Sequence, residues 1–87
     1  MNTVLVVGSN SFSGSTFVDY ALQQESRVLG ASRSAEPNDA FLPYKWCDHT
    51  NFSFHHLDLN RDLKEISVLL HDTRPEFVVN FAAQSMV

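Results

Sequence analysis

The sequence predicts an α/β fold, in which a parallel sheet with the strand order 3-2-1-4 carries helices on both faces. One observation is the apolar run from Val4 to Val7, which ends at a glycine and precedes an amphipathic segment. Such a run is typical of a buried parallel strand. Another is the order of the predicted elements, β-α-β-loop-β-α-β. Because right-handed crossovers join parallel strands, this order places the two helices on opposite faces of the sheet.

The turn after the first strand has the spacing Gly8-x-x-Ser11-x-x-Gly14. Gly8 can adopt a positive φ for a tight turn, and Gly14 allows the following helix to lie close to the strand. The first N–H groups of a helix have no partner within it and carry partial positive charge, so this turn predicts a pyrophosphate site. Ser11 replaces the middle glycine of a G-x-x-G-x-x-G pattern, and its hydroxyl could donate a hydrogen bond to the phosphate. The alternative is a polar turn that binds no ligand.

The composition limits the size, the partners and the compartment. The 87 residues make at most one small domain of marginal stability. Ten acidic residues against six basic ones give a net charge of −4, which argues against a nucleic-acid surface. No stretch has the length of a membrane span or the pattern of a signal peptide, so we expect no membrane partner. The single cysteine, Cys47, fits a reducing compartment, and we therefore expect a cytoplasmic protein.

The first helix is expected over residues 13–24, because apolar residues recur there at spacings that form one face. Phe12, which precedes this helix, is expected to wedge between helix and sheet. The second strand is expected over residues 27–32, with its carboxyl end beside that of the first strand. The apolar face of the helix consists of Phe17, Val18, Ala21 and Leu22.

The rest of the chain predicts a loop, two strands and a second helix. The loop over residues 36–51 is interrupted by prolines, but its apolar side chains predict that it packs on the fold. Strands are expected over residues 53–59 and 76–83, and a helix over residues 61–71. The apolar stripe of this second helix consists of Leu63, Ile66, Leu69 and Leu70.

The residue after the second strand distinguishes the two nicotinamide dinucleotides. An acidic residue there binds the ribose hydroxyls of NAD, whereas this chain has Arg33, whose guanidinium can grip a phosphate. We therefore predict NADP as the cofactor, with NAD as the alternative; a solvated arginine is the competing interpretation. At the end of the third strand, Asp58 and the backbone of Leu59 are predicted to contact the adenine. A helix N-cap is the alternative role for Asp58 or Asn60.

Small residues follow the fourth strand. Ala82 and Ala83 leave space for a flat ring close to the backbone, and Ser85 could meet the ribose or the carboxamide. The histidines, including the adjacent pair His55-His56, lack the spacing of metal ligands, because neighbours in a strand point to opposite faces. We predict no metal site.

One helix on each face covers only part of a four-stranded parallel sheet, which is normally buried on both sides. The last predicted strand would also form an exposed apolar edge. We therefore expect residues 1–87 to be the N-terminal part of a dinucleotide-binding domain in a longer protein, or to need a partner chain. A homo-oligomer is left open as a form of that partner.

Three segments occur in the order and spacing of a known family: the turn from Gly8 to Gly14, the pair Asp58-Leu59, and the run from Arg74 to Ser85. With them the chain resembles the NAD(P)-dependent epimerase/dehydratase family, the extended short-chain dehydrogenases/reductases, which implies a Rossmann-like fold. Its Ala-Ala-Gln-Ser segment and the arginine after the second strand look most like the GDP-mannose dehydratases and related nucleotide-sugar dehydratases. The chain departs from the family at Ser11, and at Met86, where near relatives often carry histidine.

The resemblance implies an oxidoreductase or lyase of nucleotide-sugar metabolism, in which the cofactor takes hydride from a sugar and often returns it. Neither Tyr20 nor Tyr44 begins the family's Tyr-x-x-x-Lys pair, so we expect no catalytic residue in these 87 residues. The alternatives are a non-catalytic NAD(P)-binding regulatory relative and an inactive truncated product. The implied cofactor-binding residues are Gly8, Asn10, Ser11, Phe12 and Gly14 for the pyrophosphate turn, Arg33 for the 2′-phosphate, Asp58 and Leu59 for adenine, and Ala82, Ala83 and Ser85 for ribose and nicotinamide.

Overall fold

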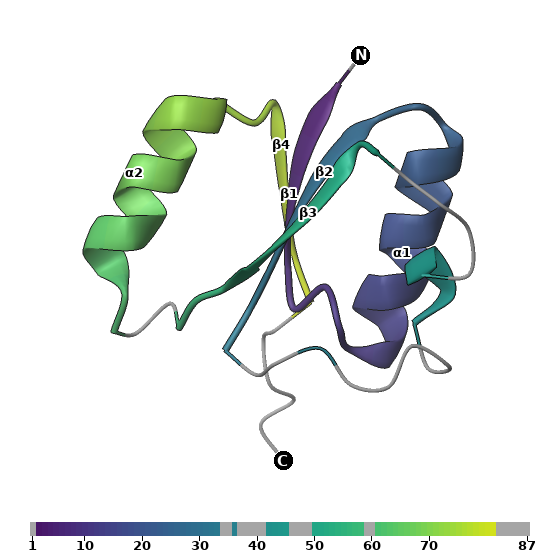
Figure 1. Cartoon of the computed structure of the whole chain (residues 1–87), viewed down its shortest axis with the longest axis horizontal. Coiled ribbons are helices and arrows are strands. Elements are labelled where there is room, and N and C mark those ends of the chain that lie inside the picture. The colour runs from purple at the N-terminus through teal and green to yellow at the C-terminus, as the bar shows by residue number, and fades with distance from the viewer. Residues whose placement is uncertain (1, 34–35, 37–41, 46–49, 59–60, 82–87) are drawn as a thin grey trace.

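Four parallel strands form one sheet in the order β3-β2-β1-β4, which confirms the predicted order 3-2-1-4 (Figure 1). The computed structural model describes residues 2–33, 36, 42–45, 50–58 and 61–81. Its strands are β1 (Thr3–Val7), β2 (Arg27–Ser32), β3 (Phe52–His56) and β4 (Phe77–Asn80). Its helices are α1 (Phe12–Gln23) and α2 (Leu63–Thr73), with a short 3-10 helix η2 (Pro43–Lys45).

All four strands end at the same edge of the sheet. Val7 of β1 is aligned with Ala31 of β2 on one side and with Asn80 of β4 on the other. Ser32 of β2 is aligned in turn with His56 of β3. We call this the carboxyl edge, because the chain leaves every strand there and the segments that follow the strands meet along it.

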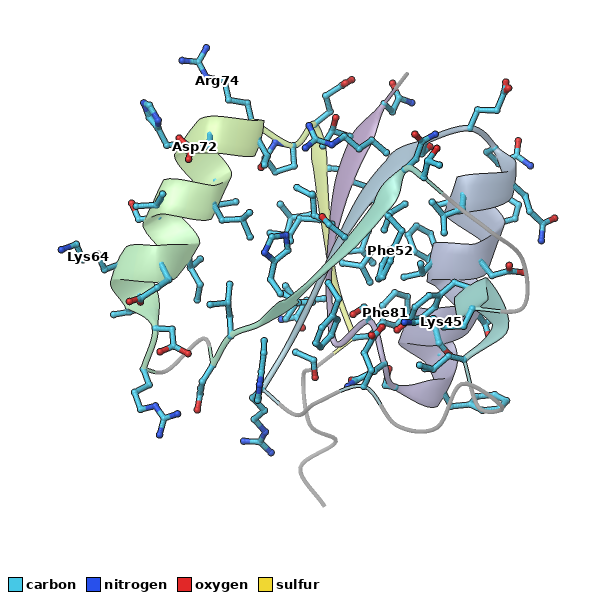
Figure 2. The ribbon with its side chains drawn as sticks, viewed as in Figure 1. Lys45, Phe52, Lys64, Asp72, Arg74 and Phe81 are labelled. Atoms are coloured by element: carbon cyan, nitrogen blue, oxygen red, sulfur yellow. The ribbon has the colours of Figure 1, made fainter. Side chains whose placement is uncertain are left out.

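The two helices lie on opposite faces of the sheet, as predicted (Figure 1). Neighbouring strand residues point to opposite faces, so the two central strands, β1 and β2, supply both cores. The core under α1 is the larger one, and Figure 2 shows Phe52 and Phe81 between the sheet and this helix. Its buried members are Val4, Val6, Val18, Ala21, Leu22, Val28, Leu42 and Tyr44. The core on the α2 face consists of Leu5, Val7, Leu29 and Ala31, with Leu69 packed against it.

The loop before β3 packs on α1, as its apolar composition predicts. Leu42 is fully buried and Tyr44 is 3% exposed, both in the same core as α1. The Tyr44 hydroxyl donates to Glu36 Oε2 at 2.5 Å, and Lys45 Nζ lies 3.1 Å from Glu36 Oε1. The Tyr44 ring also contacts Phe52, with 4.6 Å between the ring centroids. These contacts hold the described part of the loop against both α1 and the sheet.

The face of the sheet under α2 is only partly covered. The described part of α2 has no buried residue, and Leu63 is 66% exposed, so the predicted apolar stripe reaches the core only through Leu69. Figure 2 shows Lys64 and Asp72 on the side of α2 that faces away from the sheet. On β4, one of the two edge strands, Phe77 is 55% exposed, which confirms the predicted apolar edge.

The wedge predicted for Phe12 is wrong. Its side chain is 90% exposed. Because Ser11 is the N-cap, Phe12 becomes the first residue of the helix, and its side chain points into solvent there. Phe17, one and a half turns later, packs between helix and sheet instead, with its ring centroid 5.7 Å from that of Phe81. The helix consequently begins at Phe12, one residue earlier than predicted.

Three later boundaries also differ from prediction. β3 ends at His56 rather than at residue 59, because the Asp58 N–H turns to the Asp62 carboxylate at 2.8 Å. α2 therefore spans residues 63–73 rather than 61–71. β4 covers residues 77–80 of the predicted 76–83, and residues 82–83 lie outside the described part. Neither helix in the described ranges has the length and apolar content needed to cross a bilayer.

Candidate cofactor site

The chain passes from β1 into α1 through a tight turn at the carboxyl edge. Gly8 has a φ of 82°, in the left-handed region that favours glycine, which confirms the predicted tight turn. Its N–H donates to the carbonyl oxygen of Ala31 at 2.7 Å and so ties the turn to the end of β2. The turn is thereby fixed between two neighbouring strand ends.

Gly14 lies against the backbone of this turn. A Cβ atom at this position would lie 2.0 Å from the carbonyl oxygen of Gly8 and 2.8 Å from Ser11 Oγ. No side chain fits in that space, so Gly14 sets how closely α1 approaches the end of β1. The predicted close approach is confirmed.

Ser11 is the N-cap of α1. Its Oγ accepts a hydrogen bond from the Gly14 N–H at 3.0 Å and donates one to the Gly8 carbonyl oxygen at 2.8 Å. The hydroxyl proton is thus used inside the turn. The phosphate contact predicted for this hydroxyl would have to replace its bond to Gly8.

Two N–H groups in the first turn of α1 form no hydrogen bond with any described residue. The Ser15 N–H donates to the Ser11 carbonyl oxygen at 2.8 Å, and the Gly14 N–H is capped by Ser11. Within the part of the chain that the structure describes, the two groups without such a bond are the N–H groups of Phe12 and Ser13. Such groups at a helix N-terminus carry partial positive charge and attract anions. The geometry therefore fits the diphosphate of a dinucleotide.

Arg33 and Asp58 lie at the same edge, after β2 and β3. Arg33 is exposed, and its carbonyl oxygen lies 2.8 Å from His56 Nε2. Asp58 is half-buried, and its carbonyl oxygen accepts from the N–H groups of Arg61 and Asp62 at 3.0 and 2.8 Å. The N-cap of α2 is Asp62, so the alternative of a cap at Asp58 is wrong.

The structure brings only part of the predicted site together. Asn10 is half-buried in the turn between β1 and α1. The pyrophosphate turn, Arg33 and Asp58 follow three neighbouring strands at the carboxyl edge. The other candidates, and the alternative cap, lie outside the described residues: Leu59, Asn60, Ala82, Ala83 and Ser85.

Sequence reasoning missed the contact between Ser9 and Gly30 under the turn. Ser9 is fully buried, and its Oγ has no hydrogen-bond partner among the described residues. A Cβ atom at Gly30 would lie 2.6 Å from Ser9 Oγ and 3.0 Å from Phe52 Cε1. A glycine inside a predicted strand often marks such a close approach, and that signal was present at Gly30.

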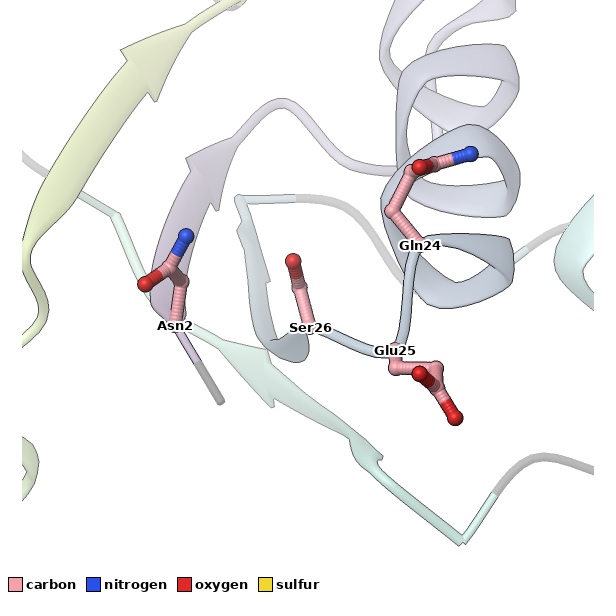
Figure 3. A pocket seen from close by; sticks show the side chains of 4 residues that line it. All are labelled: Asn2, Gln24, Glu25 and Ser26. Atoms are coloured by element: carbon pink, nitrogen blue, oxygen red, sulfur yellow. The ribbon is translucent and has the colours of Figure 1, made fainter.

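A polar hollow of about 380 Å³ lies at the opposite end of the strands (Figure 3). Its lining comes from the start of β1 and from the connection between α1 and β2, and no predicted cofactor residue takes part. The lining residues are Asn2, Gln24, Glu25 and Ser26. The hollow and the predicted cofactor residues that the structure describes therefore lie at opposite ends of the sheet. In the described part of the chain, no group of three or more His, Cys, Asp or Glu could hold a metal ion.

A parallel sheet of this order, with a glycine turn into a helix N-terminus at the point where the strand order reverses, defines a Rossmann-like dinucleotide-binding fold. A comparison with models of protein families identifies the family within this fold. The family model described as GDP-mannose 4,6 dehydratase matches residues 5–87, and the chain belongs to this family. A search of the curated proteins finds no match.

Solved structures of larger enzymes share the fold. The dTDP-glucose 4,6-dehydratase of Bacillus anthracis, in complex with NAD, is 24% identical to this chain, with a TM-score of 0.80. The matched region covers 97% of this chain and 27% of the dehydratase chain. WbmH of Bordetella bronchiseptica, in complex with NAD⁺, is 25% identical to this chain, with a TM-score of 0.79. The matched region covers 100% of this chain and 27% of the WbmH chain. The UDP-glucose 4-epimerase of Thermus thermophilus, in complex with NAD, is 28% identical to this chain, with a TM-score of 0.74. The matched region covers 98% of this chain and 25% of the epimerase chain. This chain thus spans about a quarter of their length.

Proposed function

We propose that this chain binds NAD(P) as the coenzyme-binding part of a nucleotide-sugar dehydratase or epimerase. The observation that carries the proposal is the pair of open N–H groups, Phe12 and Ser13, at the N-terminus of α1. Membership of the GDP-mannose 4,6-dehydratase family supports the reaction class, and the related structures that contain NAD support the coenzyme. In such a reaction the bound nicotinamide would accept hydride from a sugar carbon of a nucleotide-sugar substrate.

The residues present fit a bound diphosphate. The Phe12 and Ser13 N–H groups would donate to its oxygens, with the dipole of α1 adding to the attraction. Gly8 and Gly14 carry no side chains, so the turn and the helix can lie close enough to form this corner. On the same proposal, Asn10 and Ser11 lie beside the diphosphate. The segments after β3 and β4 supply the adenine, ribose and nicotinamide contacts, through Asp58, Leu59, Ala82, Ala83 and Ser85.

The preference between the two dinucleotides is proposed to rest on Arg33. It follows β2 directly, is exposed, and forms none of the ion pairs in the described part of the chain. An acidic residue, which would repel a 2′-phosphate, is absent from this position. A guanidinium can bind that phosphate through two parallel hydrogen bonds, which favours NADP over NAD.

Calorimetric titration of the 87-residue chain, shown to be folded by circular dichroism, tests both steps. The ligands are NADPH, NADH and nicotinamide mononucleotide, which lacks the diphosphate link. We expect saturable binding of both dinucleotides, tighter for NADPH, and none of the mononucleotide. Arg33→Ala should weaken NADPH binding by about ten- to a hundredfold and leave NADH unchanged.

Arg27→Ala is the matched control, because Arg27 is also exposed but begins β2, at the opposite end of the strand from Arg33. It should change neither affinity. A folded chain that binds neither dinucleotide would contradict the proposed function. An Arg33→Ala variant with undiminished NADPH affinity would contradict only the role of Arg33 in preferring NADP, and would leave the proposed function standing.

A further inference from the structure

The side chain of His56 is bonded to the backbone of Arg33. His56 Nε2 lies 2.8 Å from the Arg33 carbonyl oxygen, although the two residues are 23 positions apart. A carbonyl oxygen only accepts hydrogen bonds, so His56 must carry a proton on Nε2 and donate it. The bond therefore joins the end of β3 to the segment that leaves β2.

This bond lies just beyond the last backbone bond between the two strands. Ser32 and His56 are aligned in the sheet, and the Ser32 carbonyl oxygen accepts from the Leu57 N–H at 2.8 Å. The imidazole of His56 extends the attachment by one residue, from Ser32 to Arg33. The backbone from which the Arg33 side chain starts is thus held where it would otherwise leave the sheet.

We propose that His56 is a positioning residue for coenzyme selection: it holds the Arg33 backbone so that the guanidinium can bind the 2′-phosphate of NADP. This inference rests on the proposed function. A two-point contact between guanidinium and phosphate depends on where the side chain starts, and a backbone already held loses less freedom on binding. NADH has no 2′-phosphate, so its affinity is independent of His56.

The neighbouring histidine provides a matched control. His55 Nε2 lies 3.2 Å from Ser53 Oγ, within β3 itself, and the described contacts do not join it to Arg33. His55→Ala removes an imidazole from the same strand and leaves the bond to Arg33 in place. Any effect of losing an imidazole as such should therefore be present in both histidine variants.

The test measures dissociation constants of NADPH and NADH for the 87-residue chain and its variants. His56→Ala should weaken NADPH binding by about two- to tenfold without changing NADH binding. His56→Gln should keep most of the NADPH affinity, because the glutamine amide nitrogen can donate a hydrogen bond at a similar distance from the backbone. His55→Ala should leave the ratio of the two affinities unchanged. In an Arg33→Ala background, His56→Ala should have no further effect on NADPH.

Circular dichroism melts show whether each variant is folded, and His56→Phe replaces His56→Ala if the latter unfolds, because it keeps a ring but cannot donate. An equal loss for both coenzymes, or an unchanged loss in the Arg33→Ala background, would overturn the positioning role and leave the proposed function standing. Binding of neither coenzyme to the folded wild-type chain would overturn the proposed function, and the role of His56 with it.

Discussion

Replacing Gly14 by alanine tests the close approach of α1 to the turn after β1. The added Cβ would lie 2.0 Å from the Gly8 carbonyl oxygen, well under the 3.0 Å below which real Cβ atoms have essentially no contacts. That oxygen cannot easily move, because it accepts hydrogen bonds from both the N–H and the hydroxyl of Ser11, at 3.1 and 2.8 Å. The helix or the turn must therefore shift.

The expected change in the free energy of unfolding combines two destabilising effects and one stabilising effect. Overpacking costs about 1–3 kcal/mol, and opening the turn sacrifices hydrogen bonds of about 0.5–1.5 kcal/mol each. Alanine is favoured over glycine inside a helix by about 1 kcal/mol, which offsets part of this loss. We therefore expect Gly14→Ala to lower the free energy of unfolding by about 3 kcal/mol, a large part of the stability of a small domain.

Urea unfolding followed by circular dichroism measures this change. Ser13→Ala is the matched control, because Ser13 is exposed and its side chain forms no hydrogen bond in the described part of the chain; its effect should stay within about 0.5 kcal/mol. A Gly14→Ala chain that unfolds at the same or a higher urea concentration would refute the reasoning, since that is the result expected for alanine at an unobstructed helical position.

Three further predictions can be checked by the same unfolding experiment. Gly30→Ala should cost about 1–3 kcal/mol because its Cβ would lie 2.6 Å from Ser9 Oγ, and adding Ser9→Gly should recover part of the loss; no recovery would refute the contact. Ser9→Ala alone should raise the free energy of unfolding by about 1 kcal/mol, because it removes a buried hydroxyl without a described partner; a loss would contradict that. Leu42→Ala should cost about 2–5 kcal/mol and Leu63→Ala less than about 1, and equal costs would argue against the packed loop.

The sheet order and the turn could be predicted because local rules determine them. A buried apolar run such as Val4 to Val7 and right-handed crossovers leave few arrangements for four parallel strands. Gly8 and Gly14 follow from steric limits that act within a few residues. Serine favours the N-cap position, so the sequence also contained a signal for the role of Ser11. The apolar spacing predicted a helix start at Ser13 and so did not identify this cap.

The rest depends on contacts that periodicity does not report. The spacing of Leu63, Ile66 and Leu69 identifies a face of α2, but not how much of that face another element covers. Asp62 and Glu65 have the spacing of a capping pair, but the Asp62 side chain forms no capping bond and accepts from the Asp58 N–H instead. The bond from His56 to Arg33 joins distant segments through a side chain, and only the three-dimensional arrangement reveals it.

On the proposed function, the N–H groups of Phe12 and Ser13 bind the diphosphate of a dinucleotide. Amide NMR spectra of the 87-residue chain, recorded during titration with NADPH, show whether these two groups bind it. We predict that the signals of Phe12 and Ser13 shift most and saturate together, while those of Glu25 and Ser26 at the opposite end of the strands do not move. Saturable NADPH binding that shifts Glu25 and Ser26, or that leaves Phe12 and Ser13 unchanged, would contradict the account.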